Sequence, residues 1–192
     1  MHNKKSFILG SLLLAMSMAT IADPSVFMDL SHDFGGAQLG EVWFADGQID
    51  EVRANQGLNL AIGIVFPIDS GLELQSSIGL QWSEQAAGNG SMGWYSFPWR
   101  TQLLASLGAL SLGGGVVWFS SPMLTTEGVL APLGERRFDN ALGYQAELAW
   151  RLFPSAENGG MRVGARYTTV DFVAAGETVR GDSAGVFVRF GF

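Results

Sequence analysis

Strict alternation of apolar and polar residues is the dominant pattern of this chain. It is clearest in segments 72–82, 95–107, 142–152, 161–167 and 184–192, where nearly every second residue is apolar and most of those between are polar or small. A period of two is typical of β-strands with one buried face. The spacing of an amphipathic helix is absent, and no segment after the N-terminus reaches 18 apolar residues in a row. The pattern therefore predicts an all-β protein.

Turn signals between the alternating segments divide the chain into eight expected strands. We expect them near 26–45, 48–66, 71–84, 94–107, 109–121, 139–153, 161–172 and 183–192. The links at Pro67–Ser70, Gly108 and Pro154–Gly160 are short, and those after the third, fifth and seventh strands are longer, the longest being about Pro122–Phe138. Short turns on one side and long loops on the other are typical of outer-membrane barrels, with the short turns periplasmic. An even strand number returns the C-terminus to the periplasmic side.

A soluble β-sandwich would also show alternation, with its apolar face turned inward. Two features favour a membrane barrel instead. Large aromatic residues stand at strand ends on the apolar faces, as in the aromatic girdles of such barrels: Phe66, Trp82, Trp94, Tyr95, Trp118, Trp150 and Phe192. The polar faces hold no lysine, although a solvated face normally uses it freely. The sequence thus predicts an eight-stranded antiparallel up-and-down transmembrane β-barrel with a confined polar lumen, and leaves the sandwich as the alternative.

The N-terminus predicts export. A basic stretch, Met1–Lys5, precedes the apolar run Phe7–Met16 and the small residues that end at Ala22. We read residues 1–22 as a signal peptide and 23–192 as the barrel domain. A membrane anchor is the rival interpretation, but the run is too short and too diluted for one. No cysteine follows the cleavage site, which excludes a lipid-anchored form.

Composition and charge exclude several function classes. The chain has 192 residues, 47% hydrophobic and 15% charged, with no cysteine. It therefore has no disulfides, no thiolate metal site and no cysteine nucleophile. Its only two lysines lie in the signal peptide, so the mature part has nine arginines against 18 acidic residues, a net charge of −9. Such an acidic chain is not expected to bind nucleic acid.

The first hairpin is the least regular element. Asp46-Gly47 is a strong two-residue turn signal. Pairing across it sets Leu30 opposite Gly63, although the neighbouring apolar face runs through Leu58 to Phe66 on the other parity. One extra residue would correct the register, and Gly35-Gly36 is the expected bulge. The acidic tip of this hairpin should stand in solvent.

The chain resembles the small outer-membrane β-barrels of Gram-negative bacteria, the eight-stranded OmpA/OmpX-type superfamily. The resemblance covers residues 23–192 and rests on the signal peptide, the eight alternating strands and the C-terminal stretch Val186–Phe192. Leu112–Val116 and Asp139–Gly143 are similar to segments of uncharacterised barrels of this kind. Pro98 departs from the pattern, because proline cannot donate a ladder hydrogen bond, and a kink is expected there. The resemblance implies an outer-membrane location and recognition of Phe192 and the last strand by the barrel-assembly machinery.

Charged residues on the polar faces predict a network inside the barrel. The inward-facing set is Asp29, Asp33, Glu73, Arg100, Glu147, Arg151, Arg162, Arg166 and Arg189. We expect Glu147 near Arg166, and Arg189 opposite Asp29 across the closing seam. Because an unpaired buried charge is very costly, these groups should pair. The pairing favours a polar plug that holds the barrel closed, and a gated path for ions or small solutes is the alternative.

Catalysis and metal binding are weakly indicated. His32, the one histidine of the mature part, is flanked by Ser31 and Asp33, but neighbours in a strand point to opposite faces. Asp46, Asp50 and Glu51 offer oxygen ligands in one exposed tip without the spacing of a known calcium loop. We therefore expect no catalytic site, no metal and no cofactor.

The functional expectation is an integral outer-membrane protein, monomeric, with a structural or surface-interaction role through its acidic loops. Its expected surroundings are outer-membrane lipid and lipopolysaccharide. A narrow pore is the second hypothesis, and a lipid-modifying enzyme is the third.

Overall fold

The computed structural model describes residues 23–44, 46–87, 90–153 and 160–192. The predicted signal peptide, residues 1–22, lies outside the described residues. Among the residues that are described, no helix is long and apolar enough to cross a membrane.

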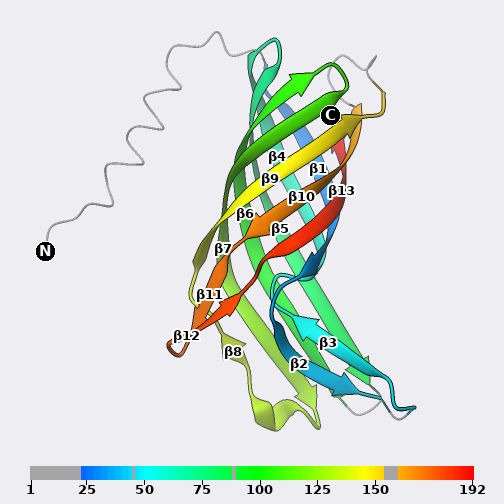
Figure 1. Cartoon of the computed structure of the whole chain (residues 1–192), viewed down its shortest axis with the longest axis vertical. Coiled ribbons are helices and arrows are strands. Elements are labelled where there is room, and N and C mark those ends of the chain that lie inside the picture. Colours follow the sequence, from blue (N-terminus) through cyan, green and yellow to red (C-terminus); the bar gives the residue numbers. More distant parts are fainter. Residues whose placement is uncertain (1–22, 45, 88–89, 154–159) are drawn as a thin grey trace, which may run out of the picture.

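Eight strands form a closed antiparallel barrel, which confirms the predicted fold class. Each strand pairs with its sequence neighbours in the ring, and β1 pairs with β13 to close it (Figure 1). The barrel strands are β1 (Ser25–Gly35), β4 (Gly57–Asp69), β5 (Leu72–Ala87), β6 (Gly90–Leu107), β7 (Leu110–Gly128), β9 (Ala141–Arg151), β10 (Gly160–Thr169) and β13 (Ser183–Gly191).

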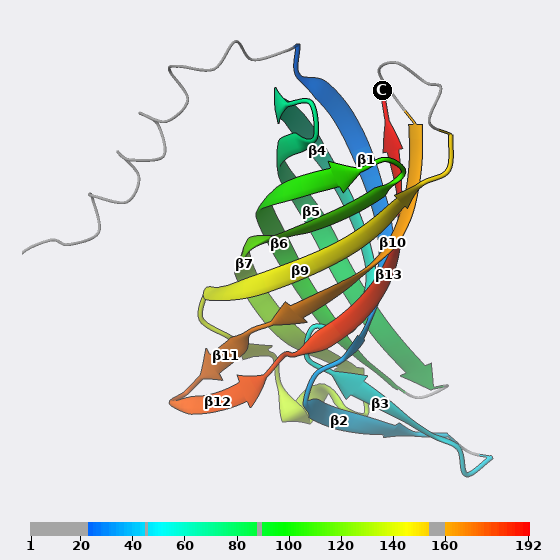
Figure 2. The same cartoon turned by 45° about the horizontal axis from the view of Figure 1, so that its top comes forward.

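Additional short elements gather at the end of the barrel away from the C-terminus (Figures 1 and 2). They are two hairpins, a short strand on β7 and a 3-10 turn. Their bounds are β2 (Gln38–Trp43) with β3 (Ile49–Arg53), β11 (Asp171–Ala174) with β12 (Glu177–Arg180), β8 (Arg136–Arg137) and η1 (Ala131–Leu133). We call this end the loop end. The opposite end holds the short turn at Gly108, whose φ is 65°.

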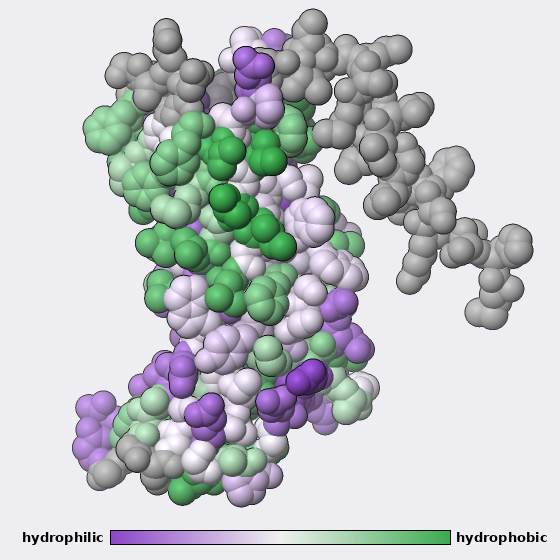
Figure 3. Space-filling model, turned by 180° about the vertical axis from the view of Figure 1, so that it is seen from behind, coloured by the Kyte–Doolittle hydropathy of each residue, from purple (hydrophilic) through white to green (hydrophobic). Residues whose placement is uncertain are grey.

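The outward-facing residues of the strands form an apolar belt. From Gly57 to Ile64, the residues of β4 alternate between buried and exposed, and the exposed ones are Leu58, Leu60, Ile62 and Ile64. Figure 3 shows hydrophobic side chains concentrated over the half of the barrel away from the loop end. A belt of this kind is the surface that a barrel presents to lipid.

The first hairpin differs from the expectation. We predicted one long hairpin over 26–66 with a bulge at Gly35-Gly36, and this is wrong, because β1 leaves the barrel at those glycines. Their φ values are 123° and 79°. A Cβ on Gly36 would lie 1.7 Å from the carbonyl oxygen of Ala54. The two backbone segments therefore approach so closely that only glycine fits at this position. The residues that follow form the separate hairpin β2–β3.

The expected adjustment of the register is nevertheless present. Leu30 lies opposite Leu60 rather than Gly63, so both contribute to the outer belt. The turn is longer than two residues, since the amide of Phe44 donates to the carbonyl of Gln48, and Asp46 accepts a hydrogen bond from the backbone of Gln48.

One other expectation is corrected, and the expected irregularity at Pro98 is present. The link after the third strand is not a long loop, because β5 and β6 remain paired as far as Ala87 and Gly90. Beside Pro98 the ladder to β5 is interrupted, since paired positions stop at Ile78–Trp99 and resume at Gln81–Ser96. On the β7 side the register shifts between Tyr95 and Phe97, where Ser121 adopts a φ of 50°. Pro98 itself stays in register, opposite Phe119.

Candidate functional site

The lumen is filled by charged and amide side chains along most of the barrel. Of the predicted inward set, Asp29, Asp33, Arg100, Glu147, Arg166 and Arg189 are buried. The remaining three lie toward the end with short turns. Glu73 and Arg162 are paired there with little exposure, and Arg151 is half-buried opposite Arg162 in the register.

Arg189 is the centre of this network. Its guanidinium bonds to Asp29 at 2.8 Å and to Glu147 at 2.8 Å, so one cation joins β13 to its neighbour β1 and, past β10, to β9. Arg166 completes the arrangement by bonding both oxygens of Asp29, at 2.7 and 2.8 Å. Charge-assisted bonds of this kind offset the large cost of burying the charges.

The pairing differs in one respect from the expectation for Glu147 and Arg166. These two residues lie directly opposite in the register of β9 and β10, yet each bonds to a different residue. Arg166 reaches Asp29, whereas Glu147 accepts from Arg189 and from Gln102. The register thus sets which residues lie opposite each other, but the long side chain of Arg166 reaches past its register partner to Asp29.

Glutamines link the ion pairs into one layer. Gln102 donates to Glu147 and accepts from Gln145, which in turn accepts a bond from Nε of Arg100. Gln75 accepts from Arg189 at 2.7 Å and donates to Glu73. The carboxamides therefore supply the bonds that the ion pairs leave open.

Arg100 and Asp33 are not bonded to an oppositely charged group. Asp33 accepts a bond from Gln81 through one oxygen, while its other oxygen and Nη1 of Arg100 have no partner among the described residues. Water can satisfy both, because it donates and accepts. A Cβ on Gly185 would lie 2.0 Å from the free oxygen of Asp33, so this glycine leaves the space that the carboxylate occupies.

Two inward-facing phenylalanines pack against the arginines. The guanidinium carbon of Arg189 lies 5.0 Å from the ring centroid of Phe27 and 4.7 Å from that of Phe187, and Arg166 is also 4.7 Å from Phe187. These are cation–π contacts. The rings cover Gly63 and Gly164, where a Cβ would clash with them. Neither phenylalanine is in the predicted inward set. Both lie on strand faces otherwise made of glycine and polar residues, and that position was the available signal.

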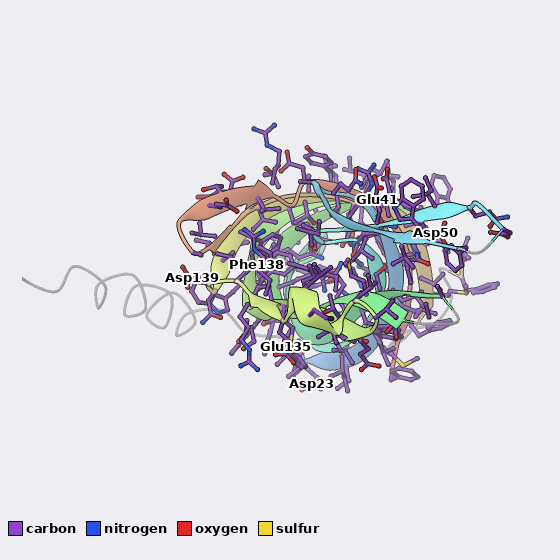
Figure 4. The ribbon with its side chains drawn as sticks, turned by 90° about the horizontal axis from the view of Figure 1, so that it is seen from below. Asp23, Glu41, Asp50, Glu135, Phe138 and Asp139 are labelled. Carbon is purple, nitrogen blue, oxygen red and sulfur yellow. The ribbon has the colours of Figure 1, made fainter. Side chains whose placement is uncertain are left out.

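Above the polar layer, the loop end is closed by an apolar cluster that we call the loop-end plug. Its members come from the barrel wall and from all three loop regions, and their rings and methyl groups are almost fully buried. They are Val42, Val52, Ala54, Met92, Trp94, Val117, Phe119, Leu124, Phe138, Ala141, Val170, Phe172 and Ala174. Figure 4 shows the loop end, with Phe138 inside the ring of strands.

Four aromatic rings form the centre of the plug. Phe172 meets Trp94 at 5.1 Å and Phe119 at 5.3 Å between ring centroids, and Phe138 meets Trp94 at 5.3 Å. All these contacts are edge-to-face, the favoured geometry of aromatic pairs. Trp94 was expected in the outer girdle, and that is wrong: its exposed fraction is 0%. Its neighbour Tyr95 takes the other face of β6, as successive residues in a strand must.

The other candidate residues lie outside the lumen network. His32 is partly buried and its ring stacks on Phe34 at 4.3 Å. Asp46, Asp50 and Glu51 are on the β2–β3 hairpin, where Glu51 pairs with Arg53. In the described part of the chain, no three metal-ligating side chains gather at one place.

Comparison with known proteins identifies the fold of the chain. No protein-family model and no curated protein matches the sequence. Among solved structures, the chain is similar to Ail, the attachment invasion locus protein of Yersinia pestis, in complex with the heparin analogue sucrose octasulfate. The TM-score is 0.54 at 11% identity, over 86% of this chain and 97% of that one. It is also similar to Neisserial surface protein A, with a TM-score of 0.52 at 13% identity, over 88% of this chain and 97% of that one.

The chain therefore has the fold of small outer-membrane β-barrels, and its exposed apolar belt matches an outer-membrane location.

Proposed function

We propose that this protein is a closed outer-membrane barrel with a structural or surface-interaction role, carried by its loop end. The observation that supports this proposal is the filled lumen. Arg189, Asp29 and Glu147 bridge it in the polar layer, and the loop-end plug covers it. Passage of a solute would require both barriers to open together.

Single-channel conductance in a planar bilayer tests this proposal. The folded protein, verified by its heat-modifiable mobility in a gel, should insert without conducting. The single variants Glu147→Ala and Phe172→Ala should also be silent, since each leaves one barrier in place. Reproducible steps in the wild type that change with Glu147→Ala or Arg166→Ala would show a channel instead.

A narrow gated pore is the second candidate function. It is favoured by the arginines that line the lumen and by Arg100 and Asp33, which are not held in ion pairs. The double variant Glu147→Ala/Phe172→Ala distinguishes the two candidate functions further. If only the double variant conducts, the lumen has two independent barriers, which supports the closed barrel. A lipid-modifying enzyme, the third hypothesis, receives no support from the described side chains.

The proposal extends to the oligomeric state of the barrel, its lipid surroundings and its assembly. We expect a monomer in contact with outer-membrane lipid and lipopolysaccharide, assembled through recognition of β13 and Phe192. Phe192 is 68% exposed and its amide donates to the carbonyl of Val26, so the residue is accessible at the end of the closing seam. Deletion of Phe192 should lower the amount of folded barrel in the outer membrane. Cleavage after Ala22 is tested by the mass of the mature protein.

The loop end gives one indication about partners. Ail was solved with a polyanion, the heparin analogue sucrose octasulfate. In this chain the β2–β3 hairpin holds four acidic residues against one arginine, which does not favour a polyanion at that place.

A further inference from the structure

The β2–β3 hairpin has one face anchored to the barrel and one face free. Val42 and Val52 on the inner face are 2% and 0% exposed, because they pack in the loop-end plug. Trp43 and Ile49 lie opposite each other on the outer face and are 65% and 45% exposed. Figures 1 and 2 show the hairpin projecting beside the mouth, at the end away from the apolar belt of Figure 3. An exposed aromatic–aliphatic pair on a rigid support, outside the lipid, is typical of an interaction surface.

The strand edges of this hairpin are unpaired. Within the described residues, β2 and β3 form a two-stranded sheet of their own. The backbone bonds to other elements are at its base, where Gly36 donates to Asp182 and Ala37 donates to Arg180, and the amide of Ala54 closes the base by donating to Ala37. Exposed edges offer free amide and carbonyl groups to an added strand. A partner in extended conformation can therefore continue this small sheet.

The outer face is also electrostatically unfavourable as it stands. Glu41 and Glu51 lie directly opposite each other in the register, and like charges in that arrangement destabilise a sheet. Arg53 pairs with Glu51, and Gln38 donates to Glu41 at 2.7 Å. Asp46 in the turn and Asp50, which lies opposite Val42 on the other face, add negative charge nearby. Figure 4 shows Glu41 and Asp50 on the hairpin at the edge of the mouth. A cation placed over the face would relieve the repulsion.

We infer that the β2–β3 hairpin docks an extended, lysine- or arginine-rich peptide segment of a partner protein by strand addition. Apolar side chains of the segment cover Trp43 and Ile49, and its cations neutralise Glu41 and Glu51. The inference rests on the proposed surface-interaction role and specifies the partner's chemistry. The same charges repel a second copy of this chain and the phosphates of lipopolysaccharide, so neither fits this surface as well.

Binding of designed peptides tests the inference. The probe is a short synthetic peptide with Lys and Val alternating on one face and Thr on the other, and its control replaces Lys with Glu. The barrel is held in nanodiscs of neutral lipid, and affinity is measured by fluorescence anisotropy. The Lys peptide should bind, more weakly as salt rises, and the Glu peptide should not. A Lys peptide with N-methylated backbone amides should lose binding, because it cannot add as a strand.

Matched variants locate the site. Trp43→Ser and Ile49→Ser should each weaken the Lys peptide by about tenfold, or ~1.4 kcal/mol, and Glu41→Gln/Glu51→Gln should reduce the salt dependence. Leu133→Ser, at a residue 70% exposed elsewhere at the loop end, should have no effect. Heat-modifiable mobility verifies that every variant is folded.

Three results would overturn the inference: equal binding of both peptides, binding unchanged by Trp43→Ser, or concentration-dependent dimerisation through the hairpin. Protection of Trp43 only when lipopolysaccharide is added to the nanodisc would also overturn it, in favour of a lipid contact. If the Lys peptide does not bind, the inference fails, but the proposed function of a closed, non-conducting barrel stands. Channel steps in the conductance experiment overturn that proposed function regardless of the peptide results.

Discussion

Phe172 in β11 and Trp94 in β6 meet edge to face, with ring centroids 5.1 Å apart, and neither side chain has measurable exposure. This contact attaches the β11–β12 hairpin to the barrel wall. The closure of the loop end therefore depends on packing between elements that are distant in the sequence.

Phe172→Ala should destabilise the barrel and loosen the β11–β12 hairpin. Removing a fully buried phenylalanine costs about 3–5 kcal/mol. The measurements are urea unfolding in lipid and hydrogen exchange of the β11 and β12 amides. Phe34→Ala is the matched control, because Phe34 is 53% exposed and its loss should cost far less. Equal effects of both changes would contradict a packed plug.

Arg189→Met should be one of the most destabilising single changes in the lumen. It leaves Glu147 without its arginine partner and removes one of the two arginines that bond Asp29, and breaking a buried pair in this way costs about 3–5 kcal/mol. Arg180→Met is the control, since Arg180 is 76% exposed on its side chain and its ion pair with Asp182 is long, at 3.7 Å. The midpoint of thermal unfolding in detergent gives the comparison. A wild-type midpoint for Arg189→Met would mean that the network does not hold the barrel closed.

Gly185→Ala tests the space beneath Asp33. The new methyl group would meet the carboxylate oxygen at 2.0 Å and force Asp33 away from Gln81. Overpacking of this kind costs about 1–3 kcal/mol. Gly114→Ala, whose Cβ faces outward and lies 3.3 Å from the carbonyl oxygen of Gln145, should cost much less, because only a small shift is needed there. The unfolding free energies of the two variants should therefore differ clearly.

Ile62→Arg tests the position of the belt. Ile62 is 59% exposed in the middle of β4, between Met28 and Ile78. Arginine at the bilayer midplane costs about 2–4 kcal/mol, and near zero at the interface. Val129→Arg, at the loop end, should leave folding in lipid vesicles unchanged. The same penalty at both positions would place the membrane elsewhere on the barrel.

Most of the barrel could be predicted because the period of two is a local signal. Leu142 and Trp150 are an even number of positions apart in one strand, so they share a face independently of the tertiary fold, and both are exposed on the belt. The eight-stranded barrel and the outer-membrane type of fold are confirmed in this way. The inward charges follow from the same parity, while their part in function stays a prediction.

The loop end could not be predicted on the same grounds. Gly35 and Gly36 were consistent with either a bulge or an exit, and only the close approach to Ala54 distinguishes the two. Trp94 is the exception. The alternation of β6 runs unbroken through Ser96 and Arg100, so parity alone places Trp94 on the inward face. The plug arises from contacts among three loops, which no local pattern reports.

The position of Asp29 and Arg189 has a consequence for how the barrel forms. These partners are 160 residues apart in the chain, one in the first barrel strand and one in the last. The ion pair, and the seam that it joins, cannot exist until β13 has been synthesised and exported. Contacts of such sequence separation slow folding. An unclosed barrel would expose the edges of both strands during that interval, so the chain is most vulnerable to aggregation and proteolysis before its last nine strand residues, Ser183–Gly191, find β1.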